Sequence, residues 1–421
     1  MTSKILKHNG VKIHIIKTDD RFRSCLCQIA ISDVYTPKEW FKYYYLINLL
    51  IMNNKKYPKN NILEKEKSER YGLDVNNYFV VNPSMMQCNI YARFPNPKYT
   101  EKTELKKCLD FLFEFLNNPN IENDFFDKST FESSIASRRV SLLNTKLNKN
   151  FTANTESEQI YSKENPLALS IEEKLEILDS LTKENVVDLY KELLTKHLEI
   201  FFIGNILEEE VLEIIKPNIK KINRGLKPKF KPLSSKLFIP NKEIVKEDNA
   251  YQTVVVINYN VLKINKKEQE VTSIVLEELL QKRLFETLRE KNSLLYSFSL
   301  DYLESYKRFK IVAGIDYKNL ELVKKLINQE LEKIKKGKIS QDQLKEIKRE
   351  YKGIYYQSIE SIDEILFSYV EHHTKGKLTM DKEYEEVMKV TKDEIAVLAS
   401  KLKLNLIYVL KEGDNNENAT N

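Results

Sequence analysis

Apolar and polar residues alternate along several short stretches of the chain, a pattern typical of strands with one buried face. Between these stretches the apolar residues recur about every 3.6 positions, which predicts amphipathic helices. The predicted strands are 11–19, 24–33, 73–82, 85–94, 198–206, 251–261, 294–302, 309–317 and 404–410. The predicted helices are 62–71, 105–116, 122–148, 182–194, 268–290, 317–337 and 341–370.

One further helix, which begins near Trp40 and ends before Pro58, is apolar on every side. A helix without a polar face is normally buried. Its apolar part, about 13 residues, is shorter than the roughly 20 that span a bilayer. We therefore expect it to be the central core helix of a domain.

The second half of the chain repeats the pattern of the first. Thr182 lies 22 residues before Gly204, and Thr391 lies 22 residues before Gly413; each threonine is a plausible helix N-cap, and Thr391 with Glu394 matches a capping box. The pattern predicts an α+β fold of two tandem homologous domains, each an antiparallel sheet covered on one face by helices. The predicted divisions are a first domain 1–216, a proline- and lysine-rich linker 217–243, a second domain 244–413 and a disordered polar tail 414–421.

Composition narrows the class of protein. The net charge of +6 comes from 68 basic and 62 acidic residues that are well mixed, which argues against nucleic-acid binding. With no apolar signal segment, we expect a cytoplasmic protein that does not bind membranes. The four cysteines are expected to be buried reduced thiols. The five histidines look scattered, so we predict no metal and no cofactor.

The end of the central helix carries a family resemblance. The run Lys55-Lys56-Tyr57-Pro58, followed by Arg70-Tyr71-Gly72, resembles the first active-site helix of the insulinase/pitrilysin-type zinc peptidases. This resemblance implies a duplicated, clamshell-like architecture similar to that of mitochondrial processing peptidase.

In that family the helix carries an inverted His-x-x-Glu-His zinc motif, which would fall on residues 44–48 of this chain. Tyr44 and Asn48 are poor zinc ligands and Ile47 cannot act as a base. The family's third ligand, a glutamate, would fall near 134–136, where the nearest carboxylate is Glu132. The chain thus resembles a zinc-free member of the family, with Tyr44, Ile47 and Asn48 as degenerate metal-site positions and no catalytic residue of its own.

A second resemblance lies in the stretch 284–297. Arg289 and Tyr296 match an arginine and tyrosine that in the family's enzymes hold the peptide backbone and the developing oxyanion. One departure is Ser293, where the family usually has glycine. The alternative is that Arg289 pairs with a nearby carboxylate while Tyr296 packs on a sheet.

The resemblance implies a non-catalytic subunit that pairs with a zinc-bearing homologue and contributes Arg289 and Tyr296 to peptide binding in trans. A homodimer is the other assembly that we consider. More narrowly, the motifs resemble the zinc-free member of a bacterial pair linked with 5-aminopentanol modification of elongation factor P. The alternative function is a structural or peptide-binding scaffold with no role in proteolysis; an independent peptidase is a third, weaker idea.

Overall fold

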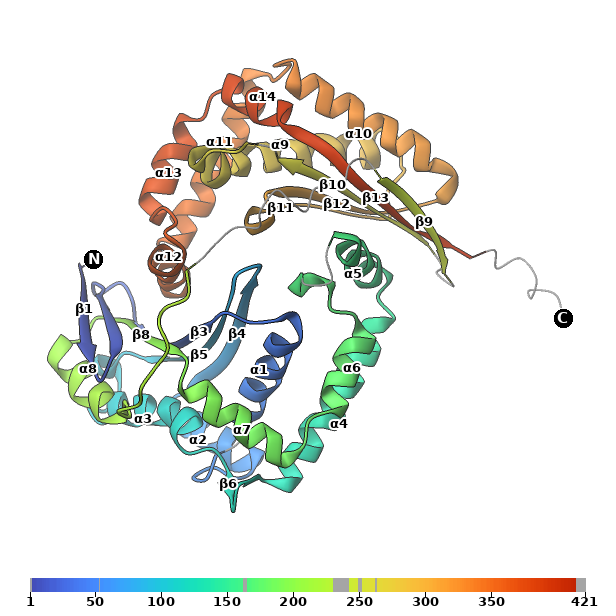
Figure 1. Ribbon diagram of the computed structural model, residues 1–421. Coiled ribbons are helices and arrows are strands. Elements are labelled where there is room, and N and C mark those ends of the chain that lie inside the picture. The colour runs from blue at the N-terminus through green and yellow to red at the C-terminus, as the bar shows by residue number, and fades with distance from the viewer. Residues whose placement is uncertain are drawn as a thin grey trace. The chain divides into compact units, whose positions relative to one another are not determined.

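The computed structural model describes residues 2–52, 54–161, 165–229, 242–248, 252–261 and 263–413. By their internal contacts these fall into two compact units, each built around one sheet (Figure 1). Unit 1 comprises 1–143, 171–230 and 358–375, and unit 2 comprises 144–170, 231–357 and 376–421. Each unit therefore contains a short segment from the other half of the sequence. These units are defined by contacts and the predicted domains by sequence duplication, so the predicted domain limits stay a prediction.

Unit 1 contains a six-stranded sheet in the order β1-β2-β8-β3-β5-β4. All neighbouring strands are antiparallel except β2 and β8, which are parallel. The strands are β1 (Thr2–His8), β2 (Val11–Lys17), β3 (Ser24–Asp33), β4 (Asp74–Asn82), β5 (Met85–Pro95) and β8 (His197–Gly204).

Helices cover both faces of this sheet. On β3, Cys25, Cys27 and Ile29 point to one face, and Leu26 and Ala30 to the other, because successive strand residues alternate. Two helices of the N-terminal half, α1 (Pro37–Leu50) and α3 (Glu104–Asn117), pack on the sheet. The other helices of this half in or bordering unit 1 are α2 (Asn60–Glu69), α4 (Lys128–Lys146), α6 (Ile171–Asp179), α7 (Lys183–Leu194) and α8 (Glu208–Ile215).

The second face of the unit 1 sheet is covered by α12 (Ile362–Lys375), a helix from the C-terminal half of the sequence. Ile362, Leu366 and Val370 of this helix are buried in one cluster with Leu26 and Phe201 of the sheet. Both faces of the central strands β3 and β8 are consequently buried.

Unit 2 contains a five-stranded sheet in the order β11-β12-β10-β13-β9, in which only β13 and β9 are parallel. The strands are β9 (Lys242–Asp248), β10 (Thr253–Val261), β11 (Ser297–Leu303), β12 (Arg308–Ile315) and β13 (Leu402–Glu412). The helices of the C-terminal half in this unit are α9 (Ser273–Phe285), α10 (Leu320–Lys335), α11 (Gln341–Ser358), α13 (Met380–Lys389) and α14 (Lys392–Ser400).

The unit 2 sheet is also covered on both faces. Val255 and Ile257 of β10 belong to the main core beneath α9, α10 and α14. Val254 and Val256 point the other way and are buried with Ala153 of α5 (Lys149–Tyr161), a helix from the N-terminal half of the sequence. In Figure 1, α5 lies on the face of this sheet opposite α9 and α10. The prediction of helices on one face only is thus incomplete for both units.

Most predicted elements are confirmed, but two helices differ. The helix expected over 122–148 begins at Lys128, because Asn123 and Asp124 have positive φ and turn a two-residue hairpin, β6 (Ile121–Glu122) and β7 (Phe125–Phe126). The helix expected over 341–370 is interrupted, and Ser361 starts α12 by accepting a hydrogen bond from the Glu364 backbone N–H at 3.3 Å. The other strands and α-helices that were not predicted are β1, β9, α5, α6, α8 and α13. The tail 414–421 and part of the predicted linker, 230–241, lie outside the described residues.

The two capping threonines are confirmed. Thr182 accepts a hydrogen bond from the Asn185 N–H at 3.2 Å, and Thr391 accepts one from the Glu394 N–H at 3.3 Å. The Asn185 and Glu394 side chains each accept from the threonine N–H at 2.8 Å. The same capping box therefore begins the helix that precedes the last strand of each repeat.

We expect Thr182→Ala and Thr391→Ala each to lower the free energy of unfolding by about 1 kcal/mol, because each leaves a backbone N–H at a helix start without its acceptor. Urea denaturation measures this change. Serine keeps the hydroxyl acceptor, so Thr182→Ser and Thr391→Ser are the matched controls. Equal stability of the alanine and serine variants would contradict the prediction.

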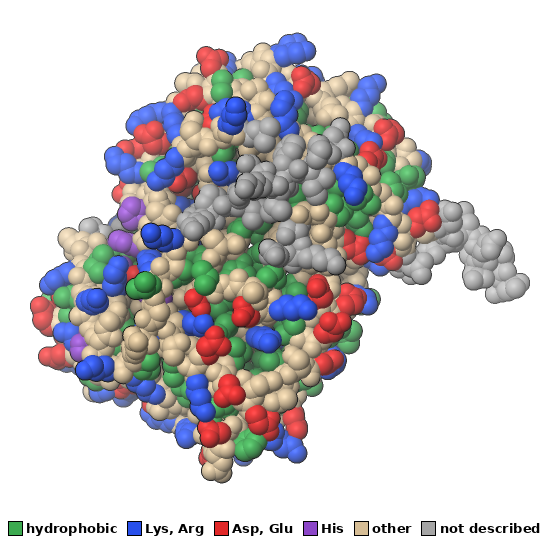
Figure 2. Space-filling view, viewed as in Figure 1, with side chains coloured by type: hydrophobic (Ala, Val, Ile, Leu, Met, Phe, Trp, Pro, Cys, Tyr) green, Lys and Arg blue, Asp and Glu red, His purple; other side chains and the backbone are tan. Residues whose placement is uncertain are grey.

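The surface charges are mixed (Figure 2), and the cysteines are buried, as the sequence predicts. Lys and Arg side chains intermingle with Asp and Glu side chains over the face shown in Figure 2. All four cysteines are buried, and burial raises the pKa of the Cys108 thiol to about 12. Among the described helices, none combines the length and apolar character needed to cross a membrane.

Candidate functional site

The three residues predicted to be degenerate metal-site positions, Tyr44, Ile47 and Asn48, lie in the second half of α1. Ile47 is fully buried in the core, whereas Tyr44 and Asn48 share a part-buried face that contacts β4. The Tyr44 ring packs edge-on against the Phe79 ring, 5.0 Å between centroids, and Asn48 accepts a 3.4 Å hydrogen bond from Asn77. The one-turn spacing thus places both side chains together, but as packing and hydrogen-bonding groups.

A cation from α4 occupies this face. The guanidinium of Arg138 lies 4.3 Å from the centre of the Tyr44 ring and 5.8 Å from that of Phe41. Nearby, the ammonium of Lys174 lies 6.0 Å from the Trp40 ring. Burial, together with the charge of Arg138, lowers the pKa of Lys174 to about 8. Such cation–π contacts stabilise the packing of α4 and α6 against α1.

The residues present do not fit zinc. Phenol, carboxamide and alkyl side chains replace imidazoles and carboxylate, and a fixed positive charge repels a metal cation. Glu132, the nearest carboxylate to the expected third ligand, is exposed and lies 3.8 Å from the ammonium of Lys128. Among the residues that the structure describes, no three His, Cys, Asp or Glu side chains are grouped so as to hold a metal ion.

β4 borders this face and forms one edge of the unit 1 sheet. Within the described part of the chain it pairs with β5 alone, from Asp74–Arg93 to Asn82–Met85. An edge strand presents backbone N–H and C=O groups that an extended peptide can pair with. The aromatic α1 face and a strand edge are therefore adjacent.

In unit 2, Arg289 and Tyr296 lie at the two ends of the connection between α9 and β11. Both are exposed, Tyr296 to 62%. The Arg289 guanidinium donates a hydrogen bond to the backbone carbonyl of Leu295, the residue before Tyr296. The Tyr296 hydroxyl donates to Asp316 at 2.8 Å, and this bond raises the tyrosine pKa. The fold thus brings the two predicted residues together, Arg289 in the helical turn Glu286–Glu290 that continues α9 and Tyr296 just before β11, and their donors already have intramolecular acceptors.

Ser293, which stands where the family usually has glycine, adopts a backbone conformation that favours glycine. Ser293 has φ +53°, in the left-handed region where glycine is favoured. Its N–H donates to the Arg289 carbonyl at 3.0 Å, and the Leu294 N–H donates to the Leu288 carbonyl at 2.8 Å. The turn that glycine would favour is therefore formed with serine, at some conformational cost.

Four of the five histidines lie close together, so the interpretation that all five are scattered is wrong. His14 on β2 and His197 on β8 each place Nε2 3.7 Å from the buried carboxylate of Glu199. His373 of α12 lies 5.0 Å from the His14 ring between centroids, and His372 lies 5.1 Å from His373. Sequence reasoning missed this cluster because parallel pairing of β2 with β8 joins positions 187 residues apart in the chain, such as Lys12 and Glu199.

Charge within this histidine–glutamate cluster is balanced by a lysine. Lys227 donates to Glu199 at 2.9 Å and to the backbone carbonyl of His373 at 3.0 Å. Burial alone raises the Glu199 pKa, but contacts with His14, His197 and Lys227 outweigh it and hold that pKa well below its usual range. Burial, with the nearby cationic groups, lowers the pKa of His373 to about 4. The cluster fastens α12 to the sheet.

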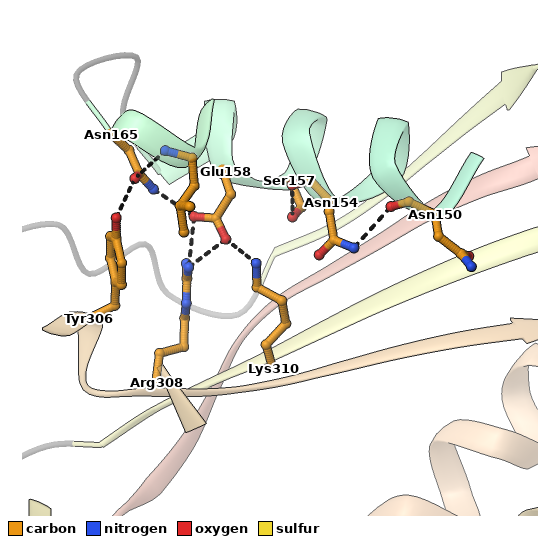
Figure 3. A network of polar contacts seen from close by, with 9 residues as sticks. Asn150, Asn154, Ser157, Glu158, Asn165, Tyr306, Arg308 and Lys310 are labelled. Carbon is orange, nitrogen blue, oxygen red and sulfur yellow. Dashed lines mark hydrogen bonds and ion pairs between the residues drawn. The ribbon is translucent and has the colours of Figure 1, made fainter. Parts of the chain in front are cut away.

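A second buried charge cluster lies in unit 2 and fastens α5 (Figure 3). Glu158 of α5 accepts hydrogen bonds from Arg308 at 2.5 and 2.7 Å and from Lys310. Asn165 donates to Glu158 at 2.6 Å and accepts from the Tyr306 hydroxyl at 3.0 Å. Burial alone raises the Glu158 pKa, and the two cations reverse this shift.

The sequence of this chain is similar to those of known proteins. Residues 180–351 match the family model described as Peptidase M16 inactive domain. The chain is 24% identical over 415 residues to "Probable inactive metalloprotease YmfF" of Bacillus subtilis (strain 168), with 96% of each chain covered.

Solved structures share the whole fold. A conserved protein from Enterococcus faecalis V583 matches with a TM-score of 0.86 at 21% identity, covering 99% of this chain and 100% of that one. A peptidase M16 inactive domain from Pseudomonas fluorescens matches with a TM-score of 0.78 at 12% identity, covering 98% and 99%. At such low identities these matches show a shared fold and nothing more. They confirm the predicted α+β architecture of two helix-packed sheets.

Proposed function

We propose, from the premise that this chain is a homologue of inactive M16-family (insulinase-type) metalloproteases, that it binds peptide without hydrolysing it. In this proposal it is the metal-free subunit of a two-chain peptidase whose other subunit carries zinc. Hydrolysis, by a metal-activated water, is then the work of the partner.

One contrast supports the proposal. The guanidinium of Arg138 occupies the face of α1 where the family's zinc ligands would lie, whereas Arg289 and Tyr296, which are suited to peptide binding, are exposed. Arg138 lies over Tyr44 where a zinc site would need open ligands. Arg289 and Tyr296 offer N–H and O–H donors at exposed positions, a suitable arrangement for a peptide carbonyl. The open edge of β4 offers backbone pairing to the same kind of ligand.

The finer assignment rests on the sequence motifs. Lys55-Lys56-Tyr57-Pro58 and Arg70-Tyr71-Gly72 support the proposal that the chain is the zinc-free member of the bacterial pair linked with 5-aminopentanol modification of elongation factor P. A gene neighbour encoding His-x-x-Glu-His would be its zinc-bearing partner.

A scaffold without a role in proteolysis is the second candidate function. It is favoured by the hydrogen bonds that Arg289 and Tyr296 already make to Leu295 and Asp316, because those bonds would have to be exchanged for bonds to peptide. The two candidates differ in what happens to activity when these side chains are changed.

We expect Arg289→Ala to lower kcat/KM of the complex with the zinc-bearing partner by about 10- to 100-fold, because a donor to the substrate carbonyl is lost. Tyr296→Phe should have a smaller effect in the same direction. Peptidase assays on the purified chain, the partner and their mixture measure this. Arg349→Ala and Tyr356→Phe, at exposed positions on α11, are the matched controls.

The first assay is zinc content and peptidase activity of the chain alone, for which we expect neither. Activity that appears or rises on mixing supports the paired-subunit proposal. Full activity of the Arg289→Ala complex would leave the scaffold function in its place, and a stoichiometric zinc in the lone chain would overturn both.

A further inference from the structure

A pocket of about 750 Å³ in unit 1 lies beside the histidine–glutamate cluster and has no part in the proposed peptide binding. It is bounded by the turn between β1 and β2, the start of β8 and the extended segment 221–227. Its volume lies within the range of pockets that hold small molecules.

The pocket is strongly cationic. Its lining includes five fully charged cations and one imidazole, and none of the described residues that line it is acidic. These side chains are Lys7, Lys12, Lys221, Arg224, Lys227 and His197. Glu199, the nearest carboxylate, lies behind the lining with its side chain only 2% exposed; it is 3.8 Å from Lys12 and 2.9 Å from Lys227. One buried carboxylate cannot neutralise five cations, so the pocket attracts anions.

The wall of the pocket is held in place before any ligand binds. The Gly225 N–H donates to the Thr195 carbonyl at 2.7 Å, and Arg224 donates to the Leu194 carbonyl. On the opposite side, Asn9 of the β1–β2 turn donates to the Ile219 carbonyl at 2.9 Å. A wall fixed in this way reduces the ordering that binding would otherwise require.

A donor at the pocket lacks a partner. Nε of Arg224 is buried and has no hydrogen-bond partner within the described residues, whereas Nε2 of His197 lies 3.7 Å from the Glu199 carboxylate. Buried polar atoms normally have partners, and those that do not need an explanation. A ligand with several anionic oxygens would supply acceptors as well as negative charge.

We propose that this pocket is a binding site for a small diphosphate, either free or as part of a nucleoside diphosphate. The diphosphate oxygens would accept from the lysine ammonium groups and the Arg224 guanidinium. This site is separate from Arg289, Tyr296 and the α1 face, so the inference stands or falls independently of the proposed function.

The test is titration calorimetry of the full chain with inorganic pyrophosphate, ADP and citrate. We expect saturable one-to-one binding of pyrophosphate, and binding of ADP at least as tight if the nucleoside adds contacts. Lys221→Glu should weaken pyrophosphate binding by about tenfold or more, because a charge-assisted hydrogen bond is replaced by repulsion. Lys102→Glu, an equal charge change at an exposed position of unit 1 outside the pocket, is the matched control.

Thermal unfolding of both variants without ligand checks that each is folded; Lys221 is exposed, so its change is not expected to disturb the core. Loss of pyrophosphate binding in Lys221→Glu alone supports the site. The proposal is overturned if the natural chain binds no pyrophosphate at millimolar concentration or if both variants weaken binding equally. Citrate binding as tight as pyrophosphate would overturn the diphosphate class and leave a general anion site.

Discussion

Glu158→Ala is expected to destabilise unit 2 by about 3–5 kcal/mol, the largest effect of any single change considered for this protein. The substitution removes the carboxylate that pairs with Arg308 and Lys310. These two residues are only 2% and 7% exposed, so two buried cations lose their counter-charge. The Arg308 guanidinium would keep its contact with the Tyr161 ring at 4.3 Å, which cannot replace an ion pair. Urea denaturation followed by circular dichroism measures the loss.

Two further variants separate charge from packing. Glu156→Ala removes a carboxylate from the same helix whose side chain is 24% exposed, and should cost about 1 kcal/mol or less. Replacing Glu158, Arg308 and Lys310 together by Leu, Met and Met removes all three charges and should cost less than Glu158→Ala alone. If Glu158→Ala unfolds at the same urea concentration as Glu156→Ala, the buried pair does not hold α5 in place.

Acidification from pH 7 to pH 4 is expected to lower the stability of unit 1 by about 2 kcal/mol, after allowance for solvent screening of the part-buried His373. The His373 pKa is about 4 in the folded chain, against 6.5 without burial, so the unfolded chain binds more protons between these values and stability falls as pH falls. Glu199, whose folded pKa is depressed, loses its contribution only below its ordinary value of 4.5. Both changes act in the same direction.

Trp40 is the only tryptophan and lies in unit 1, so its fluorescence reports the unfolding of this unit. The groups that face His373 are the His14, His372 and Tyr369 rings, the Lys227 ammonium and, behind His14, the Glu199 carboxylate. His373→Gln should flatten the loss between pH 7 and pH 5, whereas His8→Gln, on β1 outside this cluster, should leave it unchanged. An identical pH profile for the natural chain and His373→Gln would rule out His373 as the titrating group.

The elements of the fold follow largely from local sequence. Alternation predicted the strands β4 and β5, and the capping threonines marked the starts of α7 and α14. The sequence also contained a signal that helices cover the second face of each sheet. In Val254–Ile257 and in Cys25–Ile31, almost every residue is apolar, on both sides of the strand. Such runs indicate burial on two faces, which alternation alone does not describe.

What could not be predicted depends on contacts between distant segments. The Ser361-Ile-Asp-Glu364 sequence is a capping signal that would have placed the start of α12, but nothing local says which sheet that helix covers. Likewise, Arg138 over Tyr44 and Glu199 beside His14 are products of tertiary packing. The candidate site residues were found through resemblance, and their chemical surroundings only through the structure.

The exchange of α5 and α12 between the two halves of the sequence has a consequence for how the protein is made. A nascent chain emerges from the ribosome N-terminus first, yet unit 1 cannot complete its second apolar face until Lys375 has emerged. Until then Leu26, Ala30 and Phe201 lack their cover. Until most of the second half has been synthesised, the first half therefore exposes apolar surface that α12 later buries.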